Sequence, residues 1–214
     1  MLKDLLLDIL LPKKCVGCGK EGQYICKDCE IFLSEVPNLM EVRPPSVRSS
    51  VMSVWEYEGI IEKAILKIKY DGYYDIINEL ADKALEKIEL HLPLDTYITY
   101  VPMFQKKEKQ RGFNQAELIA RKIGDRYTRQ AGRLLEKVRD NRSQVDLGPA
   151  ERIENVRDVF SAAPSELMEV RPQSVLLVDD VYTTGATMAE CMKVLKKAGV
   201  KNIWGFTLAR KLRI

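Results

Sequence analysis

The sequence of 214 residues lacks several features that would each indicate a particular class of protein. Its single histidine, His91, excludes sites that need two imidazoles, such as the HExxH centre of metalloproteases. No apolar run reaches the ~18–20 residues that cross a bilayer, so we expect no membrane span. No GxxxxGK segment is present, which excludes a P-loop. The net charge of +3 is too small to indicate a nucleic-acid partner by itself.

Four of the five cysteines form a regular group near the N-terminus. The pattern is CxxC, seven residues, CxxC, and its members are Cys15, Cys18, Cys26 and Cys29. Two residues between cysteines let both thiolates reach one ion, and four thiolates in a tetrahedral array suit structural Zn²⁺. Disulfides, free thiols and an iron–sulfur cluster are the alternatives. Cys191 shares a helical stripe with apolar residues, so we expect a buried core thiol there.

The first residues predict a short amphipathic helix over residues 2–11, whose apolar stripe consists of Leu2, Leu5, Leu6 and Ile9. A secretory signal is the competing interpretation. Asp4 and Asp8 argue against it, because the core of a signal peptide is uncharged. We therefore expect a cytoplasmic protein, in a compartment where thiols stay reduced.

Strands alternate with helices along the rest of the chain. We expect strands over 51–57, 96–101, 134–138, 175–178 and 203–208, and helices over 60–69, 76–88, 114–123 and 187–198. The run 175–178 is apolar on both faces, as a central parallel strand is. This alternation predicts an α/β fold with a parallel sheet. A Pro- and Ser-rich linker at 37–50 divides the chain into two predicted domains, a four-cysteine module (1–48) and the α/β domain (49–214).

The most informative segment is VLLVDDVYTTGATM, residues 175–188. A buried strand ends in Asp179 and Asp180, and a short loop then opens a helix. Ligands of parallel sheets bind at the carboxyl ends of the strands. Two carboxylates repel phosphate, but they suit sugar hydroxyls or a Mg²⁺ ion. The simpler alternative is a solvated pair of acids beside an ordinary helix start.

The loop after this strand has the composition of an anion site. Gly185 lets the backbone approach a ligand closely, and the hydroxyls of Thr183, Thr184 and Thr187 add donors. The start of the following helix presents unpaired N–H groups and a positive dipole end, which suit a phosphate. The acids and the loop together match a phosphorylated ribose.

This segment resembles the PRPP-binding motif of type I phosphoribosyltransferases. The resemblance implies a Rossmann-like core with a flexible loop, a role that the polar stretch 139–152 would suit unless it is merely a connection. It also implies that Asp179 and Asp180 hold the ribose hydroxyls. The loop Thr183, Thr184, Gly185, Ala186 and Thr187 would hold the 5′-phosphate, and Mg²⁺ would bind together with PRPP.

Residues 101–115, VPMFQKKEKQRGFNQ, resemble the ComF family of competence-associated proteins. The four cysteines after an N-terminal helix fit the same family, as does Lys69-Tyr70 before Gly72, so the resemblance covers nearly the whole chain. One departure is that lysine stands where we expect arginine, at Lys106, Lys107 and Lys109. Lysine binds phosphate as a point charge without a bidentate fork, so these lysines either contact pyrophosphate or are solvated.

The resemblance implies a transferase in which an acceptor attacks C1 of the ribose as pyrophosphate leaves. The catalytic residues would be Asp179, Asp180 and Arg111, and Lys69 would join the loop in binding PRPP, with cations stabilising the departing charge. The sequence does not name the acceptor.

The alternative is a non-catalytic competence protein that uses the phosphoribose site for single-stranded DNA. ComF proteins are associated with DNA uptake during natural transformation, which would make other competence proteins, such as a helicase, its partners. Residues 193–213 are rich in Lys and Arg and contain no acid. Tyr70, Tyr73 and Tyr74 near Lys67 form an aromatic and basic mixture that can stack bases, although packing at a helix end is the simpler interpretation of the tyrosines.

Overall fold

The computed structural model describes residues 12–37, 51–140, 156, 158–163 and 169–212, and all structural statements below concern these residues. The predicted helix over 2–11 lies outside the described residues. So do nearly all of the predicted linker at 37–50 and most of the polar stretch at 139–152.

A parallel sheet of four strands forms the centre of the fold. The strands are β1 (Val51–Glu56), β2 (Thr96–Tyr100), β5 (Ser174–Tyr182) and β6 (Asn202–Arg210). Their order is β1-β6-β5-β2, and all three neighbouring pairs are parallel. This confirms the predicted α/β class. It also places β5 between β6 on one side and β2 on the other, so that loops from both sides reach its end.

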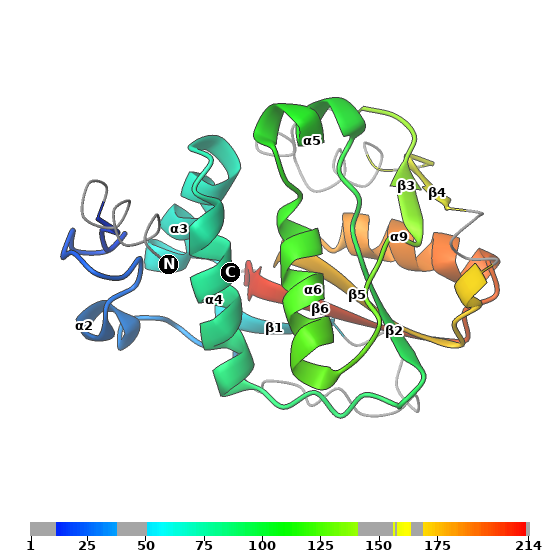
Figure 1. The fold of residues 1–214 in the computed structure, drawn as a ribbon, viewed down its shortest axis with the longest axis horizontal. Helices are drawn as coiled ribbons and strands as arrows, with labels where there is room; N and C mark the ends of the chain where they lie inside the picture. Colours follow the sequence, from blue (N-terminus) through cyan, green and yellow to red (C-terminus); the bar gives the residue numbers. More distant parts are fainter. Residues whose placement is uncertain (1–11, 38–50, 141–155, 157, 164–168, 213–214) are drawn as a thin grey trace, which may run out of the picture.

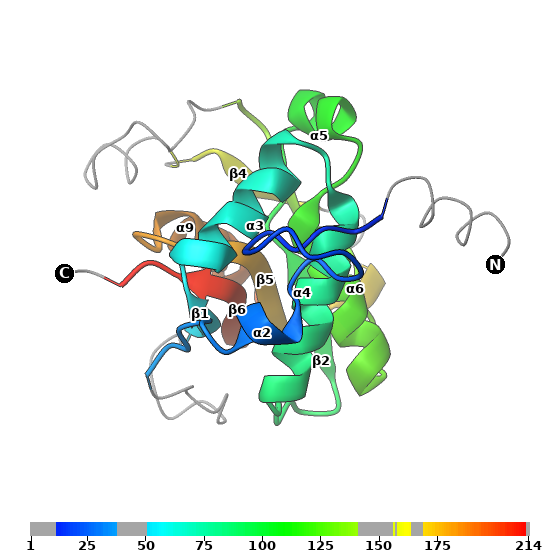
Figure 2. The ribbon, with the colours of Figure 1, turned by 90° about the vertical axis from the view of Figure 1, so that its left-hand side faces the viewer.

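Helices cover both faces of this sheet. The four helices are α3 (Gly59–Tyr70), α4 (Tyr74–Lys87), α6 (Gln115–Tyr127) and α9 (Ala186–Lys197). In Figure 2, α9 lies on one side of the sheet, and α4 and α6 lie on the other. The alternation of β5 explains both layers, because successive side chains of a strand point to opposite faces. Leu176 and Val178 pack in the core with α4 and α6, whereas Val175 and Leu177 pack in the core with α9.

The antiparallel pair β3/β4 and the helix α5 flank the sheet near the end of β2. β3 (Leu135–Lys137) pairs antiparallel with β4 (Phe160–Ala162), which confirms the predicted strand near 134–138. α5 (Gln105–Arg111) is a helix that was not among those expected from the sequence. Its Gln, Lys, Glu and Arg residues all favour helix, and it buries none of its side chains, so no apolar stripe marks it in the sequence.

The four-cysteine module packs against the outer side of α3 and α4 and contains a short helix, α2 (Lys27–Glu30) (Figure 1). Ile25 is fully buried and belongs to the main core. The end of the module runs antiparallel to β1: Val36 N–H donates to the Val54 carbonyl at 3.0 Å, and Glu56 N–H donates to the Ser34 carbonyl at 2.8 Å. The module thus covers an edge strand whose backbone groups would otherwise be free to pair with another chain.

Candidate functional site

The predicted acid pair lies inside strand β5, near its carboxyl end. We expected the strand to end before the two acids, but it continues to Tyr182. The Asp180 N–H donates to the Asp179 carboxylate at 2.8 Å. The side chain of Asp180 is only 6% exposed, so its charge needs partners within the protein.

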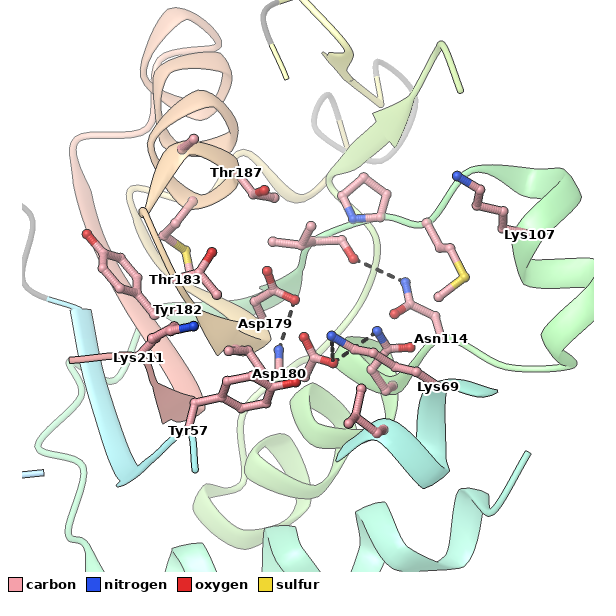
Figure 3. Close-up of a pocket in the computed structure, with 18 of the residues that line it drawn as sticks. Tyr57, Lys69, Lys107, Asn114, Asp179, Asp180, Tyr182, Thr183, Thr187 and Lys211 are labelled. Atoms are coloured by element: carbon pink, nitrogen blue, oxygen red, sulfur yellow. Dashed lines mark hydrogen bonds and ion pairs between the residues drawn. The ribbon is translucent and has the colours of Figure 1, made fainter. Parts of the chain in front are cut away.

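The partners of the Asp180 carboxylate come from two helices, α3 and α6. Lys69 of α3 places its Nζ 2.9 Å from Asp180 Oδ2, and the Gln115 amide at the start of α6 donates to the same oxygen at 3.3 Å. The Gln115 carbonyl oxygen accepts from Arg111 at 2.8 Å. Figure 3 shows Lys69 directed at Asp180. The structure therefore brings Lys69, Arg111 and the acid pair together, as the resemblance implied.

Burial changes the proton affinity of this group of residues. Burial first, and then the neighbouring charge of Asp180, raises the pKa of Asp179 to about 8. Burial opposes the charge on Lys69, but the carboxylates of Asp180 and Asp179 outweigh it and raise the pKa of this amine. A buried acid with a raised pKa and a specific charged partner is typical of a functional site.

The predicted phosphate loop connects β5 to α9. Gly185 has φ +80°, a conformation that favours glycine, and a Cβ there would lie 2.2 Å from the Tyr182 hydroxyl. Tyr182 is held in place by the guanidinium of Arg210, which stacks 4.5 Å from its ring centroid. The Thr184 hydroxyl accepts from the Ala186 N–H at 3.4 Å. The loop thus has a defined shape, with the N-terminus of the 12-residue helix α9 behind it.

These elements open into one cavity of about 530 Å³. Most of the predicted site residues line it, namely Lys69, Arg111, Asp179, Asp180, Thr183, Gly185, Ala186 and Thr187, whereas Thr184 does not. The sequence reasoning missed further polar side chains in the wall, among them Tyr57, Glu62, Lys137, Tyr182 and Lys211. Tyr57 directly follows β1 and Lys211 directly follows β6. The signal that could have found these two is their position after a parallel strand.

The three lysines of α5 differ in placement. Lys107 lines the cavity and also forms an ion pair with Asp140 at 2.7 Å. Lys106 and Lys109 are not part of the cavity wall. In Figure 3, Lys107 and Asn114 lie on one side of the acid pair, and Lys211 and Tyr57 lie on the other. The cavity therefore has basic groups on both sides of two central carboxylates.

The four N-terminal cysteines form a compact cluster in which all four sulfur atoms lie within 4.8 Å of one another; it comprises Cys15, Cys18, Cys26 and Cys29. Cys18 Sγ and Cys26 Sγ are 3.6 Å apart. Four sulfurs around a zinc ion at the usual bond length would be separated by about 3.8 Å, so the spacing fits a tetrahedral metal site. No disulfide joins them, and Cys191 is fully buried, as predicted.

Local packing holds the cluster tightly. A Cβ on Gly17 would lie 2.7 Å from Cys29 Sγ, so only glycine lets the first knuckle approach the fourth cysteine. Burial opposes ionisation of Cys15, but backbone hydrogen bonds, chiefly from Cys26, lower the pKa of its thiol to about 6. Burial and then the neighbouring thiols raise the pKa of Cys29 to about 12. A divalent cation bound to the cluster would stabilise the ionised form of all four thiols together.

A carboxylate of α4 fixes the module to the α/β domain. Glu79 accepts from the backbone N–H groups of Tyr24 at 3.0 Å and Ile25 at 2.7 Å. Lys83, one turn further along α4, pairs with Glu30 at 2.6 Å. The cysteine cluster thus lies behind α3 and α4, and none of its four residues lines the cavity.

Comparison with known proteins agrees with this arrangement. Residues 111–213 match the phosphoribosyl transferase domain family. The chain is 29% identical over 203 residues to "Competence protein F" of Haemophilus influenzae, an alignment that covers 92% of this chain and 84% of that protein. Over nearly its whole length, the chain is therefore similar to competence proteins of the ComF type. The chain is also 27% identical to "Competence protein ComFC" of Streptococcus pneumoniae, over 97% of this chain and 85% of that protein.

A third relative carries a different name. The chain is 28% identical to "DNA utilization protein YhgH" of Salmonella typhi, over 92% of this chain and 89% of that protein. The family resemblance read from the sequence is thereby confirmed. The matched domain includes the acid pair and the phosphate loop but not Lys69 or the four cysteines. Within the described part of the chain, every helix is too short or too polar to span a bilayer.

Proposed function

We propose that this protein binds Mg·PRPP in the cavity and transfers the phosphoribosyl group to an acceptor. The observation that carries this proposal is that a single cavity is lined by the acid pair of β5, by most of the loop that follows β5 and by Lys69, Arg111 and Lys107. This combination complements a molecule with a monophosphate, a sugar diol and a pyrophosphate.

Each part of the ligand has a matching group. The loop and the N-terminus of α9 would hold the 5′-phosphate through N–H and hydroxyl donors. Asp179 and Asp180 would accept from the ribose hydroxyls, and their oxygens are also ligands that Mg²⁺ prefers. When bound, Mg²⁺ would neutralise part of the pyrophosphate charge. Lys69 would remain near the acid pair and keep the charge of the site balanced.

The basic groups beside β2 would act during the transfer itself. As the bond between C1 and pyrophosphate breaks, negative charge develops on the leaving oxygens. Lys107 and Arg111 lie on the side of the cavity that follows β2, where they would stabilise this charge. Gln115 hydrogen-bonds both Arg111 and Asp180. Arg111, which would contact pyrophosphate, is therefore connected through Gln115 to Asp180, which would hold ribose.

Ligand binding is tested by thermal unfolding with and without Mg·PRPP. We expect Mg·PRPP to stabilise the wild type, and the variant Asp179→Asn with Asp180→Asn to lose that response. The matched control is Asp71→Asn, because Asp71 is exposed, pairs with Lys67 and does not line the cavity. If neither the wild type nor the control is stabilised, PRPP is not the ligand of this site.

We also propose that the four cysteines bind a structural Zn²⁺. The spacing of their sulfurs supports this, and a site with four protein ligands leaves no open position for substrate. Four thiols bind a metal only where they are kept reduced, which favours the cytoplasm as the compartment. Metal analysis of the purified protein tests the proposal, and one zinc per chain is the expected result.

A second candidate function is binding of single-stranded DNA, with other competence proteins such as a helicase as partners. Tyr70, Tyr73 and Tyr74 are 63%, 46% and 54% exposed, although Tyr73 also packs edge-on against Tyr24 and Tyr74 against Phe113. Lys67 lies 5.2 Å from the ring centroid of Tyr73. Tyr70 also lines the cavity, so a strand stacked on these rings would end near the phosphoribose site. The names of the relatives, which refer to competence and DNA utilization, agree with this function.

Fluorescence anisotropy with a labelled single strand tests this second function. We expect binding that weakens steeply as salt is raised, because phosphate contacts release counterions. Alanine at Tyr70 and Tyr74 should weaken binding by about 1–3 kcal/mol for each base that loses its stacking partner. Absence of binding at low salt would rule this function out.

A further inference from the structure

A second cavity of about 410 Å³ lies beside the first, between α5, the start of α6 and β3 (Figure 1). Its volume falls within the range of small-molecule sites, which is roughly 300–1,000 Å³. The two cavities share Pro102, Met103, Asn114 and Lys137 as a common wall. Neither the acid pair of β5 nor the loop that follows it lines the second cavity, so the proposed binding of Mg·PRPP leaves this cavity without a role.

Tyr100, the last residue of β2, brings a buried side chain with a hydroxyl to the second cavity. The residue is only 7% exposed, and no group in the described part of the chain hydrogen-bonds its hydroxyl. Asn114, also buried in this wall, differs: its amide donates to the Val101 carbonyl at 3.1 Å and accepts from the Ala116 N–H at 3.0 Å. Buried polar groups are normally hydrogen-bonded, so the Tyr100 hydroxyl is free to bind a ligand.

Glu108 of α5 lines the same cavity and is half-buried. Its carboxylate has no hydrogen bond or ion pair to any of the described residues. Burial first, and then the charge of Glu117, raises the pKa of this carboxyl, and Arg133 opposes them only in part. Burial, and then the charges of Glu117 and Glu108, also raises the pKa of Tyr100 to about 12. Glu108 and Tyr100 are therefore close together in a region of negative potential, which a cation would relieve.

The other charges of the second cavity are paired or act on the first cavity. Arg133 forms an ion pair with Glu136 at 3.5 Å. The charge of Asp179, a residue of the first cavity, acts on the amine of Lys137. Lys137 therefore serves the first cavity with its amine, although its side chain forms part of the common wall. The charge of Glu108 is the one that a ligand of the second cavity would have to balance.

We propose that the second cavity binds a protonated aliphatic amine. The ammonium group donates to the Glu108 carboxylate and to the Tyr100 hydroxyl, two acceptors that lack a partner among the described residues. The carbon chain lies against the apolar part of the wall, which consists of Pro102, Met103 and Leu135. Glu108 repels a ligand that carries a carboxylate, and a neutral alcohol leaves the charge of Glu108 unbalanced. This site is separate from the phosphoribose site and does not depend on the binding of PRPP.

Isothermal titration calorimetry with three four-carbon probes tests the site. The probes are n-butylamine, n-butanol and butyrate, compared at neutral pH and equal ionic strength. We expect n-butylamine, which is protonated under these conditions, to bind, and the alcohol and the carboxylate not to bind. Glu108→Gln should raise the Kd of n-butylamine at least about tenfold, because it removes a hydrogen bond between two charged groups. Tyr100→Phe keeps the ring and should raise the Kd about three- to tenfold.

Two control variants locate the bound amine. Glu86→Gln removes an exposed carboxylate of α4 that lines neither cavity. Asp179→Asn with Asp180→Asn removes the two central carboxylates of the first cavity. Both variants should bind n-butylamine as tightly as the wild type does.

Four results would overturn the proposal. The wild type may fail to bind n-butylamine, or it may bind n-butanol or butyrate equally tightly. Glu108→Gln may behave like Glu86→Gln, which would show that the amine does not contact Glu108. Loss of binding in the double variant of Asp179 and Asp180 would place the amine in the first cavity instead of the second.

Discussion

Replacing Lys69 by methionine tests the electrostatic centre of the cavity. Methionine keeps most of the length of the side chain and removes its charge. The Lys69 amine lies 2.9 Å from an oxygen of Asp180, whose side chain is 6% exposed. Among the described residues, the Gln115 amide at 3.3 Å is the side chain that would still hydrogen-bond Asp180. Lys69→Met therefore leaves a buried carboxylate with one weak neutral partner.

The size of the effect follows from burial. Removing one member of a buried ion pair costs about 3–5 kcal/mol, because the other charge is left without compensation. Lys67 provides the comparison on the same helix, since its pair with Asp71 at 3.6 Å has side chains 43% and 51% exposed. Exposed pairs contribute about 0–1 kcal/mol. For a chain of this size, the difference corresponds to a fall in Tm of about 10 °C.

Urea unfolding at neutral pH measures both variants. We expect Lys69→Met to lose several kcal/mol and Lys67→Met to lose less than about 1 kcal/mol. The double variant Lys69→Met with Asp180→Asn should regain most of the loss, since it removes both charges. This second variant also keeps the test informative if the single variant does not fold. Equal losses for Lys69→Met and Lys67→Met would refute the reasoning.

Three further predictions concern other parts of the molecule. Burial, and then the neighbouring charge of Asp180, raises the pKa of Asp179 to about 8. Protonated Asp179 therefore stabilises the fold at pH values below about 4, which is the pKa of this group in the unfolded chain. This contribution to stability is lost as the pH rises to about 8. The free energy of unfolding of Asp179→Asn relative to wild type, measured by urea titration, should therefore increase from pH 5 to pH 8.5. A difference between the two proteins that stays constant with pH would contradict this. Cys18→Ser should lower bound zinc below one per chain, whereas Cys191→Ser should not, as measured by metal analysis. Gly185→Ala should abolish the thermal response to Mg·PRPP, whereas Gly199→Ala, also at positive φ but with nothing within 4 Å of the added carbon, should keep it.

Some parts of the fold were predictable because their signal is local. The run before Asp179 is apolar on both faces, which is typical of a parallel strand between two helical layers. The cysteine group was predictable for a similar reason, because the CxxC spacing by itself brings two thiols to one point. α5 was missed because it buries no side chain, so burial leaves no periodic pattern in its sequence.

The sequence by itself therefore determined the strand that carries the acid pair, the Thr- and Gly-containing loop after it and the cysteine cluster, each a product of neighbouring residues. The tertiary structure alone decided that Tyr57, Lys69 and Lys211 meet Asp179 and Asp180 in one cavity. These residues come from segments far apart in the chain, and they meet because the strand order is β1-β6-β5-β2. That order depends on how whole helices pack on the two faces of the sheet, and no local spacing encodes it.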